Sequence, residues 1–449
     1  MPRLSLETVA RPFVVLVERW YPDPYVFAIL LTLVTFGLAI GLTDTGPVAA
    51  VDIWGDGLSG LLTFTTQIAM TLVLAHTLAH TDAARALLRH VASLPRSTFG
   101  AYFTVAMAAG LASLLAWSLG LAAGALLAAA VARAGHRRGL ALDYPLLVAS
   151  AYSGFVVWHM GYSGSSPLFV ATPGHALSDS IGLVPVTETV FAYWNLIIAA
   201  ITLPTVALVC ALMRPSRTTP LPDHLLTDDD EADPDPNPTT PGQRLEQWRP
   251  LSLAIGLLLA VWLARHFAAS GPALTLNVVN WSFLAAGLLL ARSPLHYVRL
   301  VTRAGATLGP ILLQYPFYAG IMGLMRDTGL VVLISDFFVS FSSADTLPFW
   351  AFVSGGIVNF FVPSGGGQWV VQGPVFVEAA RALDVPLPEV IMGVSYGDQW
   401  TNMIQPFWTI PLLAIAGLPL RSVLGYCFIT FLVSGVLLGG GLLWVGAAS

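Results

Sequence analysis

The sequence predicts an all-α polytopic membrane protein built as an inverted repeat. Hydrophobic residues make up 56% of the 449 residues and charged residues only 10%, and the mean hydropathy is +0.74, a composition that soluble globular domains do not have. Apolar runs recur from Tyr25 to Trp444, and at about 20 residues each they are long enough for transmembrane helices and too long for β-barrel strands. We expect about nine full transmembrane helices, two re-entrant helical hairpins and two broken helices.

The first repeat is expected to occupy residues 1–213. Three spans are predicted in it, at 25–42, 58–79 and 189–213. An amphipathic stretch is predicted at 81–95. A short acidic loop should join the first two spans. The apolar segment 101–132 is interrupted at Trp117–Gly120 and should form a hairpin. The segment 144–174 is too long for one span and should break at Met160–Pro167.

Residues 214–250 differ in composition from the rest of the chain. They are rich in proline, aspartate and threonine, with acidic clusters at Asp228–Glu231 and Asp233–Asp235, so we expect a disordered cytoplasmic linker. An extra connecting span is predicted at 251–268. Because it adds one crossing, the second repeat should run through the membrane in the opposite direction.

The second repeat, residues 275–449, should contain the same elements as the first. Its spans are predicted at 276–291, 308–325 and 423–444. Its amphipathic stretch is predicted at 331–341. A hairpin is expected at 349–380 and a broken helix at 388–417, with its break at Gly397–Asn402. Local matches support this alignment, since Gly110–Ser118 falls against Gly356–Ser364. Such inverted repeats are common among secondary transporters.

The clearest helix break is the Pro-Ser-Gly-Gly-Gly-Gln stretch at Pro363–Gln368, which lies inside an apolar segment. Lipid offers no partner for freed backbone groups, so such a break survives only where protein or a water-filled cavity covers it. We interpret it as the tip of the second hairpin. The alternative is a surface loop between two ordinary spans.

Arginine alone indicates the orientation, because the chain has 20 Lys and Arg residues and none is a lysine. With a cytoplasmic N-terminus and hairpins that enter and leave on one side, most arginines near span ends fall inside. The exceptions are Arg265, Arg326 and Arg381. The first hairpin then opens from the cytoplasm and the second from outside.

The breaks carry hydroxyl and amide side chains and no arginine. The candidate substrate- or ion-binding residues are Ser118, His159, Ser163, Ser165, Ser166, Ser364, Gly365, Gly366, Gly367, Gln368, Asp398, Thr401, Asn402 and Gln405. Helix N-termini favour anions and carbonyl ends favour cations, so these residues suit a small anion held by neutral donors beside a cation. We expect a Na⁺ near Ser364, Asp398 and Asn402, no other metal and no cofactor.

Asp398 and His159 are the ionisable side chains at these breaks. An acidic residue inside the membrane is costly and is a functional candidate by default. For Asp398 the alternatives are coupling to a cation or proton, gating, and a structural hydrogen-bond anchor. For His159 they are proton carrier, substrate contact and packing residue.

An enzyme is not expected. Gly161–Gly164 matches the short G-x-S-G pattern of intramembrane serine proteases, and His159 is nearby in sequence, which leaves a serine hydrolase as a remote alternative. The glycines at 365–367 form no phosphate-binding loop, because the required lysine is absent. No His/Cys cluster has metal-ligand spacing, and nothing indicates a nucleic-acid partner.

Three motifs resemble the bacterial short-chain fatty acid transporter family of the ion transporter superfamily. They are NFFVPSGGGQW at 359–369, followed by VQGP at 371–374, GDQWTNMIQPFW at 397–408, and YSGFVVWH at 152–159. The resemblance implies import of short-chain monocarboxylates such as butyrate or acetoacetate by Na⁺ or H⁺ symport, by alternating access, in the bacterial inner membrane. A dicarboxylate or other small organic anion is the alternative substrate, and relatives in the superfamily are often homodimers. The superfamily's Ser-Asn-Thr hairpin tips are not matched, so no sodium ligand is carried over from them.

Overall fold

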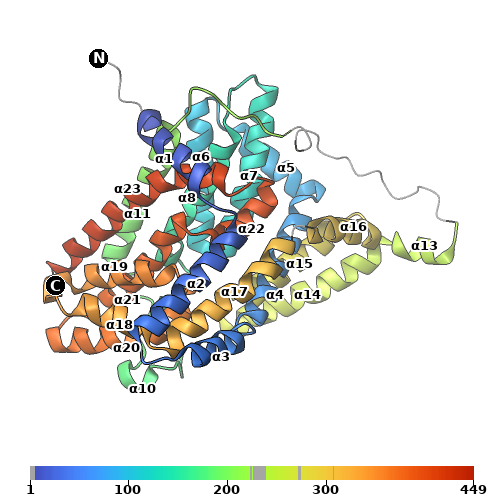
Figure 1. The fold of residues 1–449 in the computed structure, drawn as a ribbon. Helices are drawn as coiled ribbons and strands as arrows, with labels where there is room; N and C mark the ends of the chain where they lie inside the picture. Colours follow the sequence, from blue (N-terminus) through green and yellow to red (C-terminus); the bar gives the residue numbers. More distant parts are fainter. Residues whose placement is uncertain (1–5, 223–224, 226–238, 272–274, 307, 449) are drawn as a thin grey trace, which may run out of the picture.

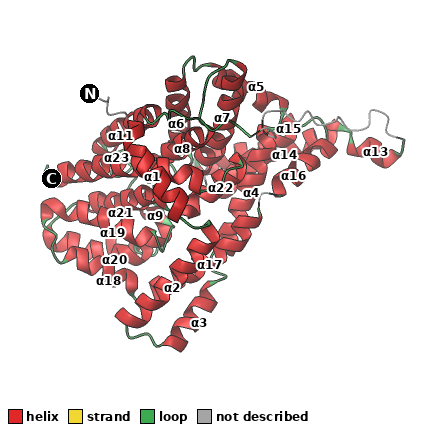
Figure 2. Cartoon of the chain, turned by 45° about the horizontal axis from the view of Figure 1, so that its top comes forward, coloured by secondary structure: helices red, strands yellow, loops and turns green. Residues whose placement is uncertain are grey.

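Helices joined by loops make up the protein in the computed structural model, which describes residues 6–222, 225, 239–271, 275–306 and 308–448. None of these residues forms a β-strand (Figure 2). The prediction of an all-α membrane protein is confirmed. The acidic clusters of the linker lie outside the described residues.

The helices of the first half follow one another in the expected order. They are α1 (Leu6–Trp20), α2 (Pro24–Leu42), α3 (Pro47–Gly57), α4 (Leu62–Ala79), α5 (Asp82–Ser93), α6 (Thr98–Leu115), α7 (Trp117–Arg137), α8 (Tyr144–Gly154), η1 (Phe155–Met160), α9 (Ser165–Val170), α10 (Ser178–Ile181) and α11 (Tyr193–Leu212).

The second half begins after the linker. Its helices are α13 (Pro241–Glu246), α14 (Arg249–Ser270), α15 (Leu276–Leu290), α16 (Pro294–Gly305), α17 (Gly309–Asp327), α18 (Leu330–Val339), η2 (Ala344–Thr346), α19 (Leu347–Asn359), α20 (Gly365–Leu383), α21 (Leu387–Thr401), η3 (Asn402–Ile404), α22 (Pro406–Ala416) and α23 (Arg421–Gly446).

Among the described residues, 7 helices are long and apolar enough to cross a membrane, or up to 8 if the bent pair α16–α17 forms one span. They are α2, α4, α6, α7, α11, α14 and α23. A polytopic membrane protein is therefore supported, whereas the predicted count of about nine spans and the inverted topology stay predictions.

The two halves repeat a packing pattern. Helix α2 packs on α17, and α4 packs on α15 in the same way. The connecting helix α3 packs on α17, as α16 packs on α4, and α5 lies on α7 as α18 lies on α20. The stretch α2–α5 thus corresponds in order to α15–α18. The sequence prediction took α3 for an acidic loop and did not identify α1 or α16 as helices.

Two helix pairs, α6–α7 and α19–α20, occupy the segments in which hairpins are expected, and the two pairs differ in length. In the first, α6 and α7 meet at the single extended residue Ala116 (φ −153°, ψ 126°). Their 18 and 21 residues correspond to about 27 and 32 Å, so the first leg is slightly shorter and the second slightly longer than a bilayer core of about 30 Å. In the second, α19 has only 13 residues, or about 20 Å, and a five-residue turn at 360–364 leads into α20.

The first broken helix breaks at 161–164, between η1 and α9, as predicted. The second breaks later than predicted, at Asn402–Gln405 rather than Gly397–Asn402, because α21 continues to Thr401. Pro406 places this break, since Gln405 before it is extended (φ −106°, ψ 137°). Gly397 serves packing instead, because a Cβ there would lie 2.2 Å from the Phe352 carbonyl oxygen of α19.

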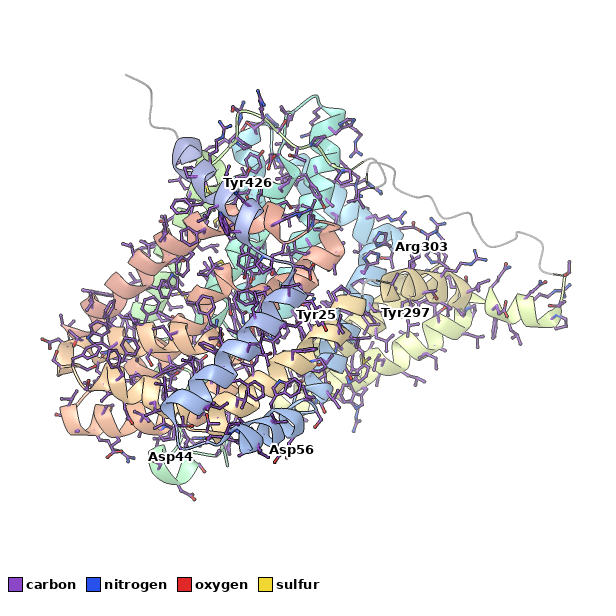
Figure 3. All side chains as sticks on the ribbon, in the orientation of Figure 1. Tyr25, Asp44, Asp56, Tyr297, Arg303 and Tyr426 are labelled. Carbon is purple, nitrogen blue, oxygen red and sulfur yellow. The ribbon has the colours of Figure 1, made fainter. Side chains whose placement is uncertain are left out.

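The broken helices and both hairpins pack in the body of the protein, while α14–α16 project to one side (Figure 1). Asp44 and Asp56, beside the end of α2 and on α3, lie at one end of the molecule, whereas Arg303 on α16 lies toward the other (Figure 3). Helices α5 and α7 lie near α16, the helix that carries Arg303 (Figures 1 and 3).

Candidate functional site

Four interruptions of helical structure meet in the middle of the protein. Helix α21 contacts both η1 and α9, α20 contacts α9, and the tip of the first hairpin brings α7 against η1 and α22. Free backbone groups at helix breaks need partners, and here protein surrounds them. The predicted site residues therefore come together from both halves of the chain.

A hydrogen bond between His159 and Asp398 joins the two broken helices. His159 Nε2 lies 3.1 Å from Asp398 Oδ1, and both residues are fully buried. The backbone N–H of Ser165, the first residue of α9, donates to His159 Nδ1 at 3.1 Å. Because Nδ1 accepts, the imidazole hydrogen sits on Nε2 and is donated to the carboxylate.

Asp398 uses only one of its two oxygens. Oδ1 accepts from His159 and also from Asn402 Nδ2 at 3.1 Å. Among the described residues Oδ2 has no hydrogen-bond partner although it is buried. Gln399 fixes the backbone of the opposite break, since its Oε1 accepts the His159 N–H at 2.9 Å.

Asn359, the last residue of α19, completes this group and was not among the predicted site residues. Its Nδ2 lies 2.7 Å from Asn402 Oδ1, 2.9 Å from Thr401 Oγ1 and 3.0 Å from the Asp398 carbonyl oxygen. Its Oδ1 is buried without a partner in the described structure. A lone amide in an apolar helix, just before the hairpin tip, is the signal that could have identified it.

The tip of the second hairpin rests on His159. A Cβ at Gly365 would lie 2.3 Å from His159 Cε1 and 2.6 Å from Nε2, so only glycine fits there. Ser166 Oγ donates to the Gly365 carbonyl oxygen at 3.0 Å. The first amides of α20 have no carbonyl one turn earlier to bond to, which makes this helix start a suitable place for an anion.

Gly366, Gly367 and Ser364 are less constrained than Gly365. A Cβ at Gly366 would meet its nearest neighbour, Ser165 Cβ, at 3.8 Å, and at Gly367 it would meet Ser364 Oγ at 3.0 Å. The three glycines thus have different roles. Gly365 allows close approach to His159, whereas a Cβ at Gly366 would make only an ordinary van der Waals contact.

Three of the predicted residues hold helices together. Gln368 Nε2 donates to the Gly355 carbonyl oxygen at 2.8 Å and to Gln372 Oε1 at 3.0 Å, so it links the two legs of the second hairpin. Thr401 Oγ1 donates to the Gly356 carbonyl oxygen at 2.9 Å and ties α21 to α19. The Gln405 amide reaches the Phe360 carbonyl oxygen only at 3.5 Å.

The first hairpin tip is capped by the break of α8–η1–α9. Ser163 Oγ accepts the Trp117 N–H at 2.9 Å at the start of α7, and Ser118 is buried beside it. His159 is engaged with Asp398 and the Ser165 N–H. Ser163 therefore has no hydrogen bond to His159, which removes the catalytic pair that a serine hydrolase would need.

Buried polar atoms without partners are concentrated at this centre. In the described part of the chain, the unpaired oxygens here are Asp398 Oδ2, Asn359 Oδ1, Gln368 Oε1 and Gln405 Oε1. The unpaired donors are Gln399 Nε2, Trp158 Nε1, Trp408 Nε1 and Tyr318 Oη. Each unpaired buried group costs about 1–3 kcal/mol, so a cluster of them indicates a place that binds polar ligands.

An aromatic wall adjoins the polar centre. The Trp158 ring lies 3.6 Å from the His159 ring and 5.7 Å from Trp408, centroid to centroid. Trp408 packs on Trp117 of the first hairpin tip at 4.8 Å, and Phe407 stacks on Tyr315 of α17 at 4.3 Å. The wall offers an apolar surface beside the unpaired groups.

A cavity of about 560 Å³ opens between α2, α17 and α22. Asp23, Tyr25, Gln314 and Ile410 are among the residues that line it. Two of the lining residues are close in sequence to the aromatic wall, since Gln314 precedes Tyr315 and Ile410 follows Phe407 by less than one turn of α22. Gln314 Oε1 is buried without a partner among the described residues.

Comparison with solved structures gives only weak similarity. The YdaH transporter of Alcanivorax borkumensis has a TM-score of 0.46 and 17% identity, covering 95% of this chain and 99% of that one. The MtrF protein of Neisseria gonorrhoeae has a TM-score of 0.37 and 18% identity, covering 98% of this chain and 97% of that one. At these scores the similarity does not establish a common fold.

Comparison of sequences is decisive. A family model described as short chain fatty acid transporter matches residues 5–445. Proteins assigned as short-chain fatty acid transporters in Escherichia coli K12 and Haemophilus influenzae are 42% and 38% identical, each covering 94% of this chain and 96% of the relative. The family and these relatives are transporters, not enzymes. The chain therefore belongs to the short-chain fatty acid transporter family.

Proposed function

We propose that this protein imports short-chain monocarboxylates, such as butyrate or acetoacetate, by symport with sodium and by alternating access. The family membership supports the substrate class. The observation that carries the proposal is the cluster of buried, unpaired donors and acceptors around His159 and Asp398. Its donors and acceptors fall into two groups that suit an anion and a cation.

The anion is assigned to neutral donors. The start of α20 at Gly365–Gly367 presents backbone amides and the positive end of a 19-residue helix. Gln399 Nε2 and the indole N–H groups of Trp158 and Trp408 are unpaired donors of the same centre. The aromatic wall would cover a short hydrocarbon tail. No arginine belongs to the described residues of this centre, which favours a substrate with one carboxylate over a dicarboxylate.

The cation is assigned to oxygen atoms at carbonyl ends of helices. Asn359 ends α19 and Asn402 follows the end of α21, where the helix dipole favours positive charge. Asp398 Oδ2 and Asn359 Oδ1 are unpaired oxygens there. Sodium fits these groups better than a proton, because the hydrogen of His159 already lies between the imidazole and Asp398.

The cavity between α2, α17 and α22 is proposed as the cytoplasmic access path. Its volume of about 560 Å³ lies in the range of pockets for drug-sized ligands, about 300–1,000 Å³, and exceeds what a four-carbon acid fills. Leu420 lines the cavity, and Arg421 is the next residue in the chain. By the positive-inside rule, we propose that this side of the protein faces the cytoplasm together with the N-terminus. Closure of the aromatic wall would separate this path from the site.

Counterflow in proteoliposomes tests the proposal. Vesicles preloaded with unlabelled butyrate should accumulate labelled C2 to C6 monocarboxylates, and an inward sodium gradient should increase uptake at constant pH. Uptake that follows a pH gradient and ignores sodium would replace sodium by protons as the coupling ion. Transport of dicarboxylates without monocarboxylates would refute the substrate assignment.

A further inference from the structure

A narrow groove lies between α5 and the half of α7 that is farther from the hairpin tip, on the side of the protein that carries Arg303. Figure 1 shows α5 beside α7 at this edge. Arg85 and Arg89 line the groove from α5, and Arg133 and Arg137 line it from α7. No acidic residue lines it.

The register of the two helices makes the groove amphipathic. Arg85, Leu88 and Arg89 are spaced i, i+3, i+4 and therefore share one face of α5. Leu126 and Ala130 precede the two arginines on the facing side of α7. The groove thus has an apolar floor with cationic side chains beside it.

Arg133 donates to the Leu225 carbonyl oxygen at 3.3 Å, whereas Arg85 and Arg89 are not used as structural anchors in the way that neighbouring arginines are. Arg138 caps the C-terminus of α5 through carbonyl oxygens of Ser93 and Pro95 at 3.0 and 2.9 Å. Arg292 pairs with Asp82 at 2.8 Å, so the acidic residue at the start of α5 is occupied. By contrast, the Arg85 and Arg89 side chains form no hydrogen bond or ion pair within the described residues. The preference for positive charge beside a membrane does not by itself require four arginines to line one groove.

The dimensions of the groove limit the ligand. Its volume is about 40 Å³, which is room for a few water molecules at about 10–15 Å³ each and for one phosphate group, but not for a nucleotide. Leu87, on the same amphipathic helix, is 65% exposed. A helix with arginines beside exposed leucine is typical of the membrane surface.

We propose that this groove binds the phosphate headgroup of an anionic phospholipid of the adjacent leaflet. Arg85, Arg89 and Arg137 would surround the phosphate, and an acyl chain would lie along Leu88 and Leu126. Basic pockets between helices at the cytoplasmic surface bind anionic lipid headgroups in this way. Such a lipid would hold α5 against α7, one leg of the first hairpin.

Lipid titration of the purified protein tests the proposal. We would measure the melting temperature in dodecylmaltoside micelles against the mole fraction of phosphatidylglycerol, with phosphatidylcholine and inorganic phosphate as comparison arms. Phosphatidylglycerol should stabilise the wild-type protein with a saturable dependence, and phosphatidylcholine should not. The variant R85Q/R89Q should bind about 25-fold more weakly, about fivefold for each arginine removed.

Two further variants separate a specific site from general surface charge. Ala130→Leu fills the groove without changing charge and should also weaken binding. R96Q/R421Q removes two exposed arginines outside the groove and should bind as the wild type does. Wild-type binding by R85Q/R89Q, an equal loss in R96Q/R421Q, or equal stabilisation by phosphatidylcholine would each overturn the proposal. Stabilisation by inorganic phosphate alone, with no added effect of the lipid, would also overturn it.

Discussion

The contact between Gly365 and His159 gives the sharpest test of the site. An alanine Cβ at Gly365 would lie 2.3 Å from His159 Cε1, so one partner must move by about 1 Å to reach an ordinary contact. The imidazole cannot move freely, because Asp398 and the Ser165 N–H hold both of its nitrogens and Trp158 lies against its ring. The change must therefore displace the hairpin tip or break the hydrogen bond to Asp398.

The expected loss is large. Overpacking of a well-packed site costs about 1–3 kcal/mol, and a displacement of about 1 Å costs catalytic sites about 100-fold in rate. We expect Gly365→Ala to lower butyrate uptake at least about tenfold. Gly366→Ala is the matched control, since its Cβ would meet its nearest neighbour at 3.8 Å. It makes the same chemical change at the start of the same helix.

Uptake of labelled butyrate into proteoliposomes, normalised to reconstituted protein, measures the effect. The melting temperature of each variant in detergent shows whether the fold is intact. Gly366→Ala should keep most of the activity. Equal activity of the two variants, whether both are active or both inactive, would refute the proposed fit between Gly365 and His159.

Three further predictions concern side chains at the centre and at the surface. Sodium should raise the melting temperature of the wild type, and Asp398→Asn should abolish this increase because the unpaired carboxylate oxygen is lost. The variant should still fold. An unchanged response to sodium would indicate that Asp398 has only a structural role. Ser163→Ala removes the acceptor for the Trp117 N–H and should cost about 0.5–2 kcal/mol of stability with uptake largely kept; complete loss of uptake at unchanged stability would contradict a capping role. The hydrogen bond from Arg292 holds the pKa of Asp82 below its usual 3.8, so the pair stabilises the protein above that pH and its contribution is lost as pH falls through the lowered pKa. Because both side chains are substantially exposed, Asp82→Asn should cost less than about 1 kcal/mol at pH 7 and progressively less as the pH falls through the lowered pKa of Asp82. A cost in thermal melts that stays the same as the pH is lowered would be inconsistent with an ion pair.

The sequence predicted the breaks well where small and polar residues interrupt apolar segments. Lipid cannot satisfy a freed backbone, so Pro363–Gly367 and Gly161–Gly164 had to be covered by protein. The structure breaks at 161–164 and at 360–364, and Gly365–Gly367 form the first turn of α20. The same argument located the first hairpin tip to within a residue or two of Ala116.

Other features could not be predicted because one residue type serves two purposes. Gly397 resembles a helix breaker in sequence, but it lies inside α21 and allows α19 to approach. Asn359 was missed because its role depends on Asp398 and Asn402, about 40 residues further along the chain, being brought to the end of α19. Gln368 and Thr401 were predicted as binding residues, and most of their hydrogen bonds join helices.

If the protein works as proposed, the charges at the centre imply the order in which sodium and the anion bind. An ionised Asp398 is a single negative charge at full burial, and a carboxylate substrate that approaches it meets repulsion that water does not screen there. A cation on Asp398 Oδ2 cancels this charge before the anion arrives, so sodium should bind first and the anion second. Neutral donors then suffice to hold the anion, and the absence of a fixed arginine lets it leave again once the cation has gone. Symport would follow from the placement of one acidic residue beside neutral anion donors.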